Sequence, residues 1–238
     1  MSEQVTGRHG LSLLQPAQAQ KHVTVNESLL RLDGLVNLVL QGTARVQPPA
    51  VVEGECWGVG AGATGAWEGQ AGRIAIGANG GWVFATPQRG QRAFLLDRGA
   101  EAVWDGQEWR GGALTLGVWG GGISAGILEA EVAVGTGAVA ATGVEIPSHV
   151  LVLGVTARVV EAITGTLGAW ALGVEGAADR YGSGLGLRVN SWSQGLLSAP
   201  MAVWAPEELL LTALGGAFAG GRLRLAVHYL VLRVPDAM

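Results

Sequence analysis

The sequence has little of what several common chemistries need. Cys56 is the single cysteine, so an intrachain disulfide is excluded and a zinc site lacks a sulfur framework. We expect it to be a small buried thiol beside Trp57. The four histidines are far apart and show no metal-site spacing; they are His9, His22, His149 and His228. No phosphate loop ending in Gly-Lys-Ser/Thr occurs, and we therefore expect neither a metal nor a cofactor.

Charge is also sparse. Fifteen Lys and Arg against nineteen Asp and Glu give a net charge of −4, and the positive residues are scattered, which disfavours nucleic-acid binding. The start "MSEQVTGRHG" has no apolar region, so we expect no signal peptide. The uncharged run 111–128 is too short and too rich in glycine for a spanning helix. We expect a glycine-rich connector at 113–128 and no membrane insertion.

Glycine and tryptophan are abundant instead. The chain has 40 Gly, where average usage of about 7% would give about 17. Because helices tolerate glycine badly, we expect mainly strands, turns and loops. Nine Trp stand against two Tyr and three Phe. Tryptophan stacks on flat apolar faces, including sugar rings, but it also fills β-domain cores.

One helix is predicted, at about residues 24–41, after a capping-box pattern at Thr24 and Glu27 and before Gly42. Its apolar positions recur at helical spacing and are our candidates for oligomerisation: Leu29, Leu32, Leu35, Val36 and Val39. The stripe suits burial against the chain's own β domain, sister chains or a particle. It spans under three heptads, so it could not hold an oligomer alone.

The polar stretch before this helix contains Gln15, Gln18, Gln20, Lys21 and His22. These residues have no identifiable chemical partners, so we interpret the stretch as a docking segment rather than a reactive site. Together with the helix it forms an N-terminal attachment segment, residues 1–47.

Residues 48–112 predict a small antiparallel β domain. Two hairpins are indicated by turn-forming pairs between alternating apolar residues, Asn79-Gly80 and Asp105-Gly106. A tryptophan follows each turn, Trp82 and Trp109. The segment "QRAFLLD" between the hairpins predicts another strand.

Residues 129–238 predict a β-sandwich of jelly-roll type. We expect strands near 129–134, 142–147, 150–161, 166–174, 184–189, 200–204, 207–213 and 222–234. Glycine-rich turns and the lack of βαβ spacing favour this fold class, so the whole chain is expected to be mainly β. The last strand, "RLRLAVHYLVLRV", has one apolar face and one half-apolar face. The half-apolar face suits cover by a neighbour such as another subunit.

Catalysis has weak support. A glycosidase mechanism needs two carboxylates at a cleft, and the sequence cannot pair the available ones: Glu161, Glu175, Asp179, Glu207 and Glu208. Ser183 in "GSGLG" lacks the strand–serine–helix context of a nucleophile. We expect no catalytic residues.

Binding of carbohydrate has better candidates. Trp192 lies in "RVNSWSQG", an expected loop, between Asn190 and Gln194. An exposed indole among amides and hydroxyls is typical of a ligand site. A second group, Asp179, Arg180 and Tyr181, offers acceptors, a forked donor and a flat ring, although it would equally suit an ion pair that pins a loop.

The order of several motifs carries a resemblance. "QAQKH", "WEGQ" and both tryptophan hairpins, within roughly residues 11–110, resemble a family of unassigned function from prophages and alphaproteobacterial gene transfer agents. The second half, with "ADRYGSGLGL" and "RLAVHYL", is similar to terminal domains of phage fibre and spike proteins.

The resemblance implies a virion protein, a head spike or tail fibre, assembled in the cytoplasm and released with the particle. With the candidate residues above, it leads us to expect a homo-oligomer, a trimer by preference, whose second domain serves as a receptor-binding domain for host or capsular polysaccharide. Two alternatives stay open: an enzyme that degrades capsule polysaccharide, and a purely architectural collar or adaptor without glycan binding.

Overall fold

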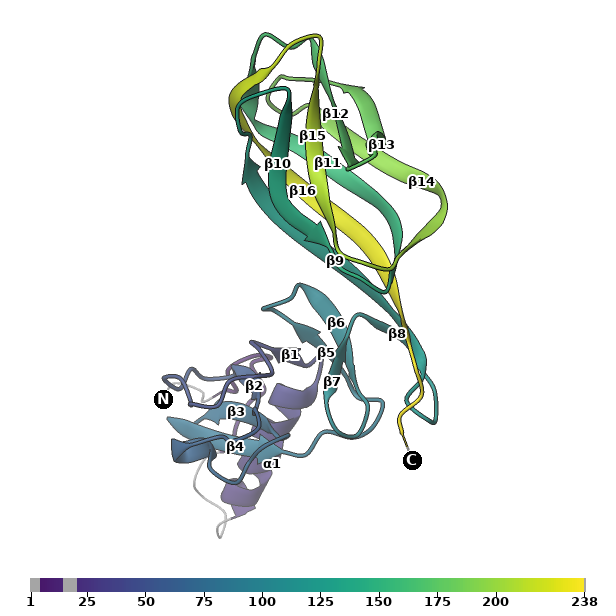
Figure 1. Cartoon of the computed structure of the whole chain (residues 1–238). Helices are drawn as coiled ribbons and strands as arrows, with labels where there is room; N and C mark the ends of the chain where they lie inside the picture. Colours follow the sequence, from purple (N-terminus) through teal and green to yellow (C-terminus); the bar gives the residue numbers. More distant parts are fainter. Residues whose placement is uncertain (1–4, 15–20, 238) are drawn as a thin grey trace. The chain divides into compact units, whose positions relative to one another are not determined.

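The chain folds into two compact units, Met1–Leu116 and Gly117–Met238. The computed structural model describes residues 5–14 and 21–237 (Figure 1). The predicted fold class is confirmed, because the described chain is mainly β with an N-terminal helix. Within these residues, no helix has the length and apolar character needed to cross a membrane.

The first unit is built on a mixed sheet with the strand order β4-β3-β2-β1-β5-β6-β7. Strand β1, which precedes the predicted domain at 48–112, runs parallel to both of its neighbours. The strand pairs within 48–112 are antiparallel, as predicted. Its elements are α1 (Lys21–Leu35), β1 (Val39–Leu40), β2 (Cys56–Gly58), the 3₁₀ helix η1 (Gly65–Trp67), β3 (Ile74–Ala78), β4 (Gly81–Ala85), β5 (Arg92–Leu95), β6 (Ala100–Trp104), β7 (Trp109–Gly111) and β8 (Ala113–Leu116).

Helix α1 ends at Leu35, well before the predicted end at Gln41. Asn37 adopts a left-handed backbone conformation, with φ of 46°, and the chain then enters β1. Leu38 and Leu40 are buried in the core of this unit. Thr24 lies inside the helix, and Glu27 pairs with Arg31 at 3.1 Å instead of closing a capping box. The helix stops because its last apolar residues gain more from the sheet's core than from another helical turn.

The end of α1 is capped by Arg8 from the N-terminal segment. The Arg8 guanidinium donates hydrogen bonds to the carbonyl oxygens of Asp33, Gly34, Val36 and Asn37, at 2.8–3.3 Å. These carbonyls have no partner within the helix, and a cation here also suits the negative end of the helix dipole. The cap therefore comes from 25 residues earlier in the chain rather than from Gly42.

Asp33 holds the same segment from the other side. Its carboxylate is 2% exposed and accepts hydrogen bonds from the Thr6 hydroxyl and the amides of Arg8 and His9, at 2.7–2.8 Å. Burial by itself would raise the pKa of Asp33, but these hydrogen bonds outweigh it and hold the pKa below its ordinary value. The N-terminal segment and α1 thus form one hydrogen-bonded assembly.

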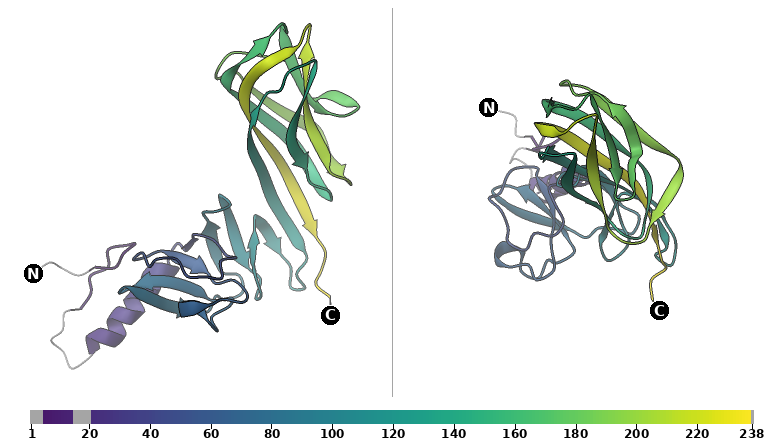
Figure 2. Two further views of the ribbon diagram at one scale, coloured as in Figure 1. Left: turned by 60° about the vertical axis from the view of Figure 1, so that its left-hand side comes forward. Right: turned by 45° about the horizontal axis from the view of Figure 1, so that its top comes forward.

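Helix α1 packs against β3 and β4 (Figure 2). A Cβ on Gly34 would lie 2.6 Å from the Ile76 side chain, so this close approach requires glycine. Cys56 is buried nearby, as predicted, and burial raises the pKa of its thiol to about 11. At neutral pH the thiol is protonated and serves as core.

The first predicted hairpin is confirmed. Asn79 and Gly80 join β3 to β4 with φ of 54° and 71°, the left-handed pair that a tight hairpin turn requires. The second hairpin differs, because four residues rather than two separate Trp104 from Trp109. The Asp105 carboxylate accepts hydrogen bonds from the amides of Gln107 and Glu108, and this stabilises the longer loop.

The second unit is a β-sandwich. Its strands are β9 (Gly122–Ala133), β10 (Val139–Ile146), β11 (Val150–Gly165), β12 (Ala169–Val174), β13 (Ala177–Leu185), β14 (Trp192–Val203), β15 (Glu207–Leu214) and β16 (Phe218–Arg233). One sheet has the order β10-β15-β12-β13, and the other contains β14-β11-β16-β9 (Figure 1). First and last strands are therefore neighbours, as in a jelly roll.

Two of these strands lie where loops were predicted. Strand β13 covers 177–185 instead of 184–189, and β14 begins at Trp192 instead of residue 200. Strands β8 and β9 also occupy much of the run 113–128, which we expected to be a connector. These segments were predicted as loops because glycine and serine have low β-strand propensity. Glycine is nevertheless required in a strand where two backbones approach closely. A Cβ on Gly195 of β14 would lie 2.0 Å from the Tyr181 carbonyl oxygen of β13.

The sandwich core is formed by alternate residues of both sheets. In β11 and β16 the inner positions include Val155, Val159, Leu225 and Val227, all at most 2% exposed. Burying each such side chain contributes about 1.5–3 kcal/mol. Because side chains alternate, the residues between them must lie on the outer face of the same strands.

Replacing Asp33 with Asn should destabilise the first unit. The amide cannot accept all three hydrogen bonds as the carboxylate does, so we expect a loss of about 2–4 kcal/mol at pH 7. Hydrogen exchange of the α1 amides measures this locally. Glu27→Gln, on the exposed side of the same helix, is the control and should cost under about 0.5 kcal/mol.

The effect of Asp33→Asn should also depend on pH. Since the folded pKa is lowered, the carboxylate's contribution is complete above its unfolded pKa of about 3.9 and is lost as the pH falls through the folded value. The difference in α1 amide protection between the wild-type protein and Asp33→Asn should therefore become smaller below a pH of about 4. A difference that grows on acidification would contradict the assignment.

Candidate functional site

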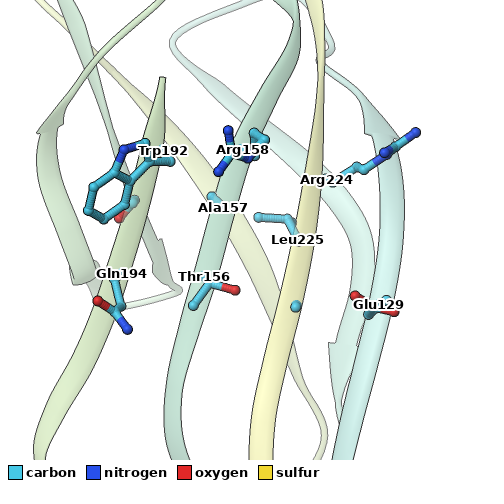
Figure 3. A pocket seen from close by; sticks show the side chains of 10 residues that line it. Glu129, Thr156, Ala157, Arg158, Trp192, Gln194, Arg224 and Leu225 are labelled. Carbon is cyan, nitrogen blue, oxygen red and sulfur yellow. The ribbon is translucent and has the colours of Figure 1, made fainter. Parts of the chain in front are cut away.

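An open groove of about 580 Å³ lies on the outer face of the sandwich, across β14, β11, β16 and β9 (Figure 3). It is lined by Glu129, Thr156, Ala157, Arg158, Trp192, Ser193, Gln194, Arg224, Leu225 and Ala226. Strand register builds the groove, since its residues are far apart in the sequence but are paired across neighbouring strands.

Two rows of paired residues cross the four strands. In the first row Trp192 is opposite Arg158, Arg158 is opposite Arg224, and Arg224 is opposite Glu131. The second row is Gln194, Thr156, Ala226 and Glu129, in the same strand order. Directly opposed residues have Cβ atoms about 4.5–5.5 Å apart, so each row is a continuous strip of side chains.

Differences in side-chain size hollow out this face. Thr156 and Ala226 are short and lie in the middle of the second row. Trp192 and Gln194 on β14 and Glu129 on β9 are longer and stand to either side (Figure 3). Along the second row the groove therefore has a floor of small residues between Gln194 and Glu129, and along the first row it is lined by Trp192, Arg158 and Arg224.

Trp192 supplies the aromatic wall. Its side chain is exposed, at 67%, and its indole has no aromatic partner in the described part of the chain. It stands on strand β14 rather than on the predicted loop, so the sheet fixes its position. Trp204, 76% exposed, differs because it lies edge-on to the His149 ring, with centroids 6.1 Å apart, and does not line the groove.

The two arginines of the groove have different surroundings. Arg224 extends toward β9, where its Nε donates to Glu131 at 2.9 Å; Glu131 also accepts from Arg222 at 3.2 Å (Figure 3). Hydrogen bonds from Arg224 and Arg222 hold the pKa of Glu131 below its ordinary value. Arg158 is exposed and has no carboxylate within ion-pair distance among the described residues.

The floor is ordered by a hydrogen bond. The Thr156 hydroxyl lies 3.2 Å from Nε2 of His228, the residue two positions beyond Ala226 on β16. This contact fixes the Thr156 side chain while leaving the hydroxyl oxygen a second hydrogen-bonding direction. With Gln194 and Glu129, the second row therefore presents hydrogen-bond donors and acceptors along one line of paired residues.

Of the predicted carbohydrate-binding residues, the structure brings Trp192 and Gln194 together in the groove. Asn190 is exposed in the turn before β14, with φ of 69°, and its amide donates to Val159. Asp179 is exposed on β13 but does not line the groove.

The other two predicted residues are engaged within the sandwich. Arg180 on β13 pairs with Glu207 on β15 at 2.7 Å, rather than within a local Asp179-Arg180 group that pins a loop. Tyr181 is 1% exposed and belongs to the core, and burial raises the pKa of its hydroxyl. The group at 179–181 therefore does not form a rim, because Tyr181 is buried in the core and Arg180 is paired with Glu207.

The sequence did not identify Glu129, Thr156, Arg158 and Arg224 as site residues. Each lies in an expected strand, and the alternation of those strands predicts an outward direction. Which outward residues become neighbours depends on pairing between β11, β16 and β9, and a single sequence does not show that register.

The predicted oligomerisation residues separate into two groups. Leu35 packs against the core of the first unit, and Val39 lies in β1 instead of the helix. Leu29 is half-buried, whereas Leu32 and Val36 are 50% and 41% exposed. The predicted docking residues Gln15, Gln18 and Gln20 lie outside the described residues.

Carboxylate, histidine and cysteine side chains are common metal ligands. Within the described residues, no group of three or more of these side chains could hold a metal ion. Of the carboxylates considered for catalysis, Glu161 lies 3.6 Å from Arg222, and Glu208 accepts a hydrogen bond from the Gly143 amide.

A family model matches part of the first unit only. Residues 25–110, within the first unit, match the family described as DUF2793, protein of unknown function. No curated protein matches the chain. A solved chain of the "Cyanophage Pam1 capsid asymmetric unit" is similar at 24% identity over 47% of this chain and 86% of that chain, with a TM-score of 0.35. At that score the likeness does not establish a shared fold or role.

Proposed function

We propose that this protein is a structural spike or fibre component of a phage-like particle, and that its sandwich binds host cell-surface polysaccharide in the groove across β14, β11, β16 and β9. The observation that carries the binding role is the exposed Trp192 beside a row of polar groups on neighbouring strands. The particle role is supported by the sequence resemblance to prophage and gene-transfer-agent proteins.

The chemistry of the groove suits a saccharide. A sugar ring has an apolar face of C–H groups, which stacks on an indole, and a rim of hydroxyls, which needs both donors and acceptors. Trp192 offers the ring, while Gln194, Thr156 and Glu129 offer an amide, a hydroxyl and a carboxylate. The groove is open along the sheet, so a long polymer could lie in it without a chain end.

The same lining does not favour hydrolysis. Glycosidases use two carboxylates on either side of the bond that breaks, and here Glu129 is the one carboxylate among the lining residues. Glu131, two residues along β9, is held by Arg222 and Arg224. Polysaccharide degradation therefore remains the alternative that would need residues from beyond this groove.

Self-association is the second part of the proposal, with a trimer preferred. Val25, Leu29, Leu32 and Val36 follow the 4-3-4 spacing of a short coiled-coil seam, and three of them are exposed by 41–50%. On the sandwich, the outer face beyond the groove becomes apolar, with exposed Ile127, Leu196 and Leu232. Sister chains are the occupants that we propose for these surfaces, because both exist on every copy.

Trp192→Ala should abolish most glycan adsorption while leaving the fold intact. Removing an exposed aromatic platform should weaken binding by about 2 kcal/mol, roughly thirtyfold, with little change in unfolding. Adsorption to a panel of purified bacterial capsular polysaccharides measures the effect. Trp204→Ala is the matched control, since it deletes an equally exposed indole of the same unit outside the groove. Equal adsorption by both variants would remove the groove from the proposal.

Leu32→Glu should shift the oligomer toward monomers. A carboxylate in the seam would have to be desolvated or the helices would separate, so we expect a lower mass by light scattering at the same protein concentration. Thr24→Glu adds the same charge to another side of α1 and should leave the mass unchanged. A wild-type protein that is monomeric at all concentrations would contradict the trimer.

A further inference from the structure

We propose that the groove selects acidic polysaccharides, with a sugar carboxylate bound by Arg158 beside Trp192. This inference rests on the proposed function and names the ligand class for the same site. It is motivated by the charges of the first row, which the proposed function alone does not use.

The two arginines of that row are directly opposed across β11 and β16. Like charges in such pairs repel, and the repulsion costs stability unless an anion is near. Glu131 offsets the charge of Arg224, to which it is bound at 2.9 Å. Arg158 has no such partner among the described residues, although it lies between Arg224 and Trp192. One positive charge of the row therefore remains uncompensated.

The position of this charge determines where an acidic group fits. The β9 side carries Glu129, which would repel a carboxylate, and Arg224, whose charge is already paired with Glu131. The β14 side carries Trp192, Ser193 and Gln194, which are uncharged. An anionic ligand is therefore favoured over β11 and β14, with its hydroxyls toward Glu129, which accepts hydrogen bonds.

The geometry of a uronic acid matches this arrangement. The carboxylate of a uronic acid is bonded directly to a carbon of the sugar ring. The carboxylate therefore lies at the edge of the ring face that stacks on an aromatic side chain. Arg158 is opposite Trp192 in the register, which places a forked donor next to the indole. A guanidinium binds a carboxylate through two parallel hydrogen bonds, whereas a neutral hydroxymethyl group cannot complete that pair.

The test is an array of bacterial capsular polysaccharides in which each uronic-acid polymer is paired with its carboxyl-reduced, neutral form. The wild-type protein should bind the acidic members, and reduction should weaken binding about tenfold or more. Arg158→Gln should lose this preference and keep the residual binding of the neutral forms. Arg158→Lys should retain part of the preference for acidic polymers, because lysine keeps the positive charge but lacks the paired donors of the guanidinium. Arg92→Gln removes an exposed positive charge from the first unit and should change nothing.

The outcomes separate this inference from the proposed function. Equal binding of acidic and reduced forms, sensitive to Trp192→Ala, would overturn the acidic preference and leave the carbohydrate site standing. An acidic preference unchanged in Arg158→Gln would overturn the role of Arg158. No binding to any member, by the wild-type protein at high valency, would overturn both proposals.

Discussion

The alternation of side chains along β11 and β16 is the constraint on which the sandwich and its groove both depend. Val155, Val159 and Leu225 must point inward to form the core, so Thr156, Arg158 and Arg224 must point outward. A shift of one residue would bury Arg158 in β11, or Arg222 and Arg224 in β16, and would expose the core. The groove is thus held in register by the free energy of core burial rather than by contacts of its own.

The same face of the sheet serves two purposes along its length. Toward Arg158 it is polar and hollowed, because short residues lie between long ones. Beyond the row of Thr156 and Ala226 it becomes apolar, with Ile127, Leu196 and Leu232 exposed. A face of this kind fits a protein that binds one partner reversibly and packs permanently against another. In our proposal these are a polysaccharide and the sister chains.

The first unit shows how distant parts of the sequence determine one helix. Apolar spacing predicted a helix in this region, but the end at Leu35 depends on Arg8, which binds the last carbonyls, and on the burial of Leu38 in the sheet's core. Neither contact follows from local sequence, since one partner is 25 residues away. Local turn chemistry was more informative: Asn79-Gly80 predicted its hairpin, and the fold class followed from glycine content and alternating strands.

Only those residues of the candidate site that stand out in their local sequence could be predicted. Trp192 and Gln194 were found because an indole among polar residues is unusual. Tyr181 was misplaced, since its strand was taken for a loop and its ring belongs to the core. Glu129, Thr156 and Arg224 could not be found, because only the pairing of β11, β16 and β9 brings them together.

Whether the groove holds the ligand can be seen in a crystal structure of the protein with a capsule oligosaccharide. We predict a sugar ring stacked on Trp192, with hydroxyls at Gln194 and Thr156. A saccharide bound elsewhere, for example at Trp204 and His149, with the groove occupied by solvent, would show that the groove is not the binding site.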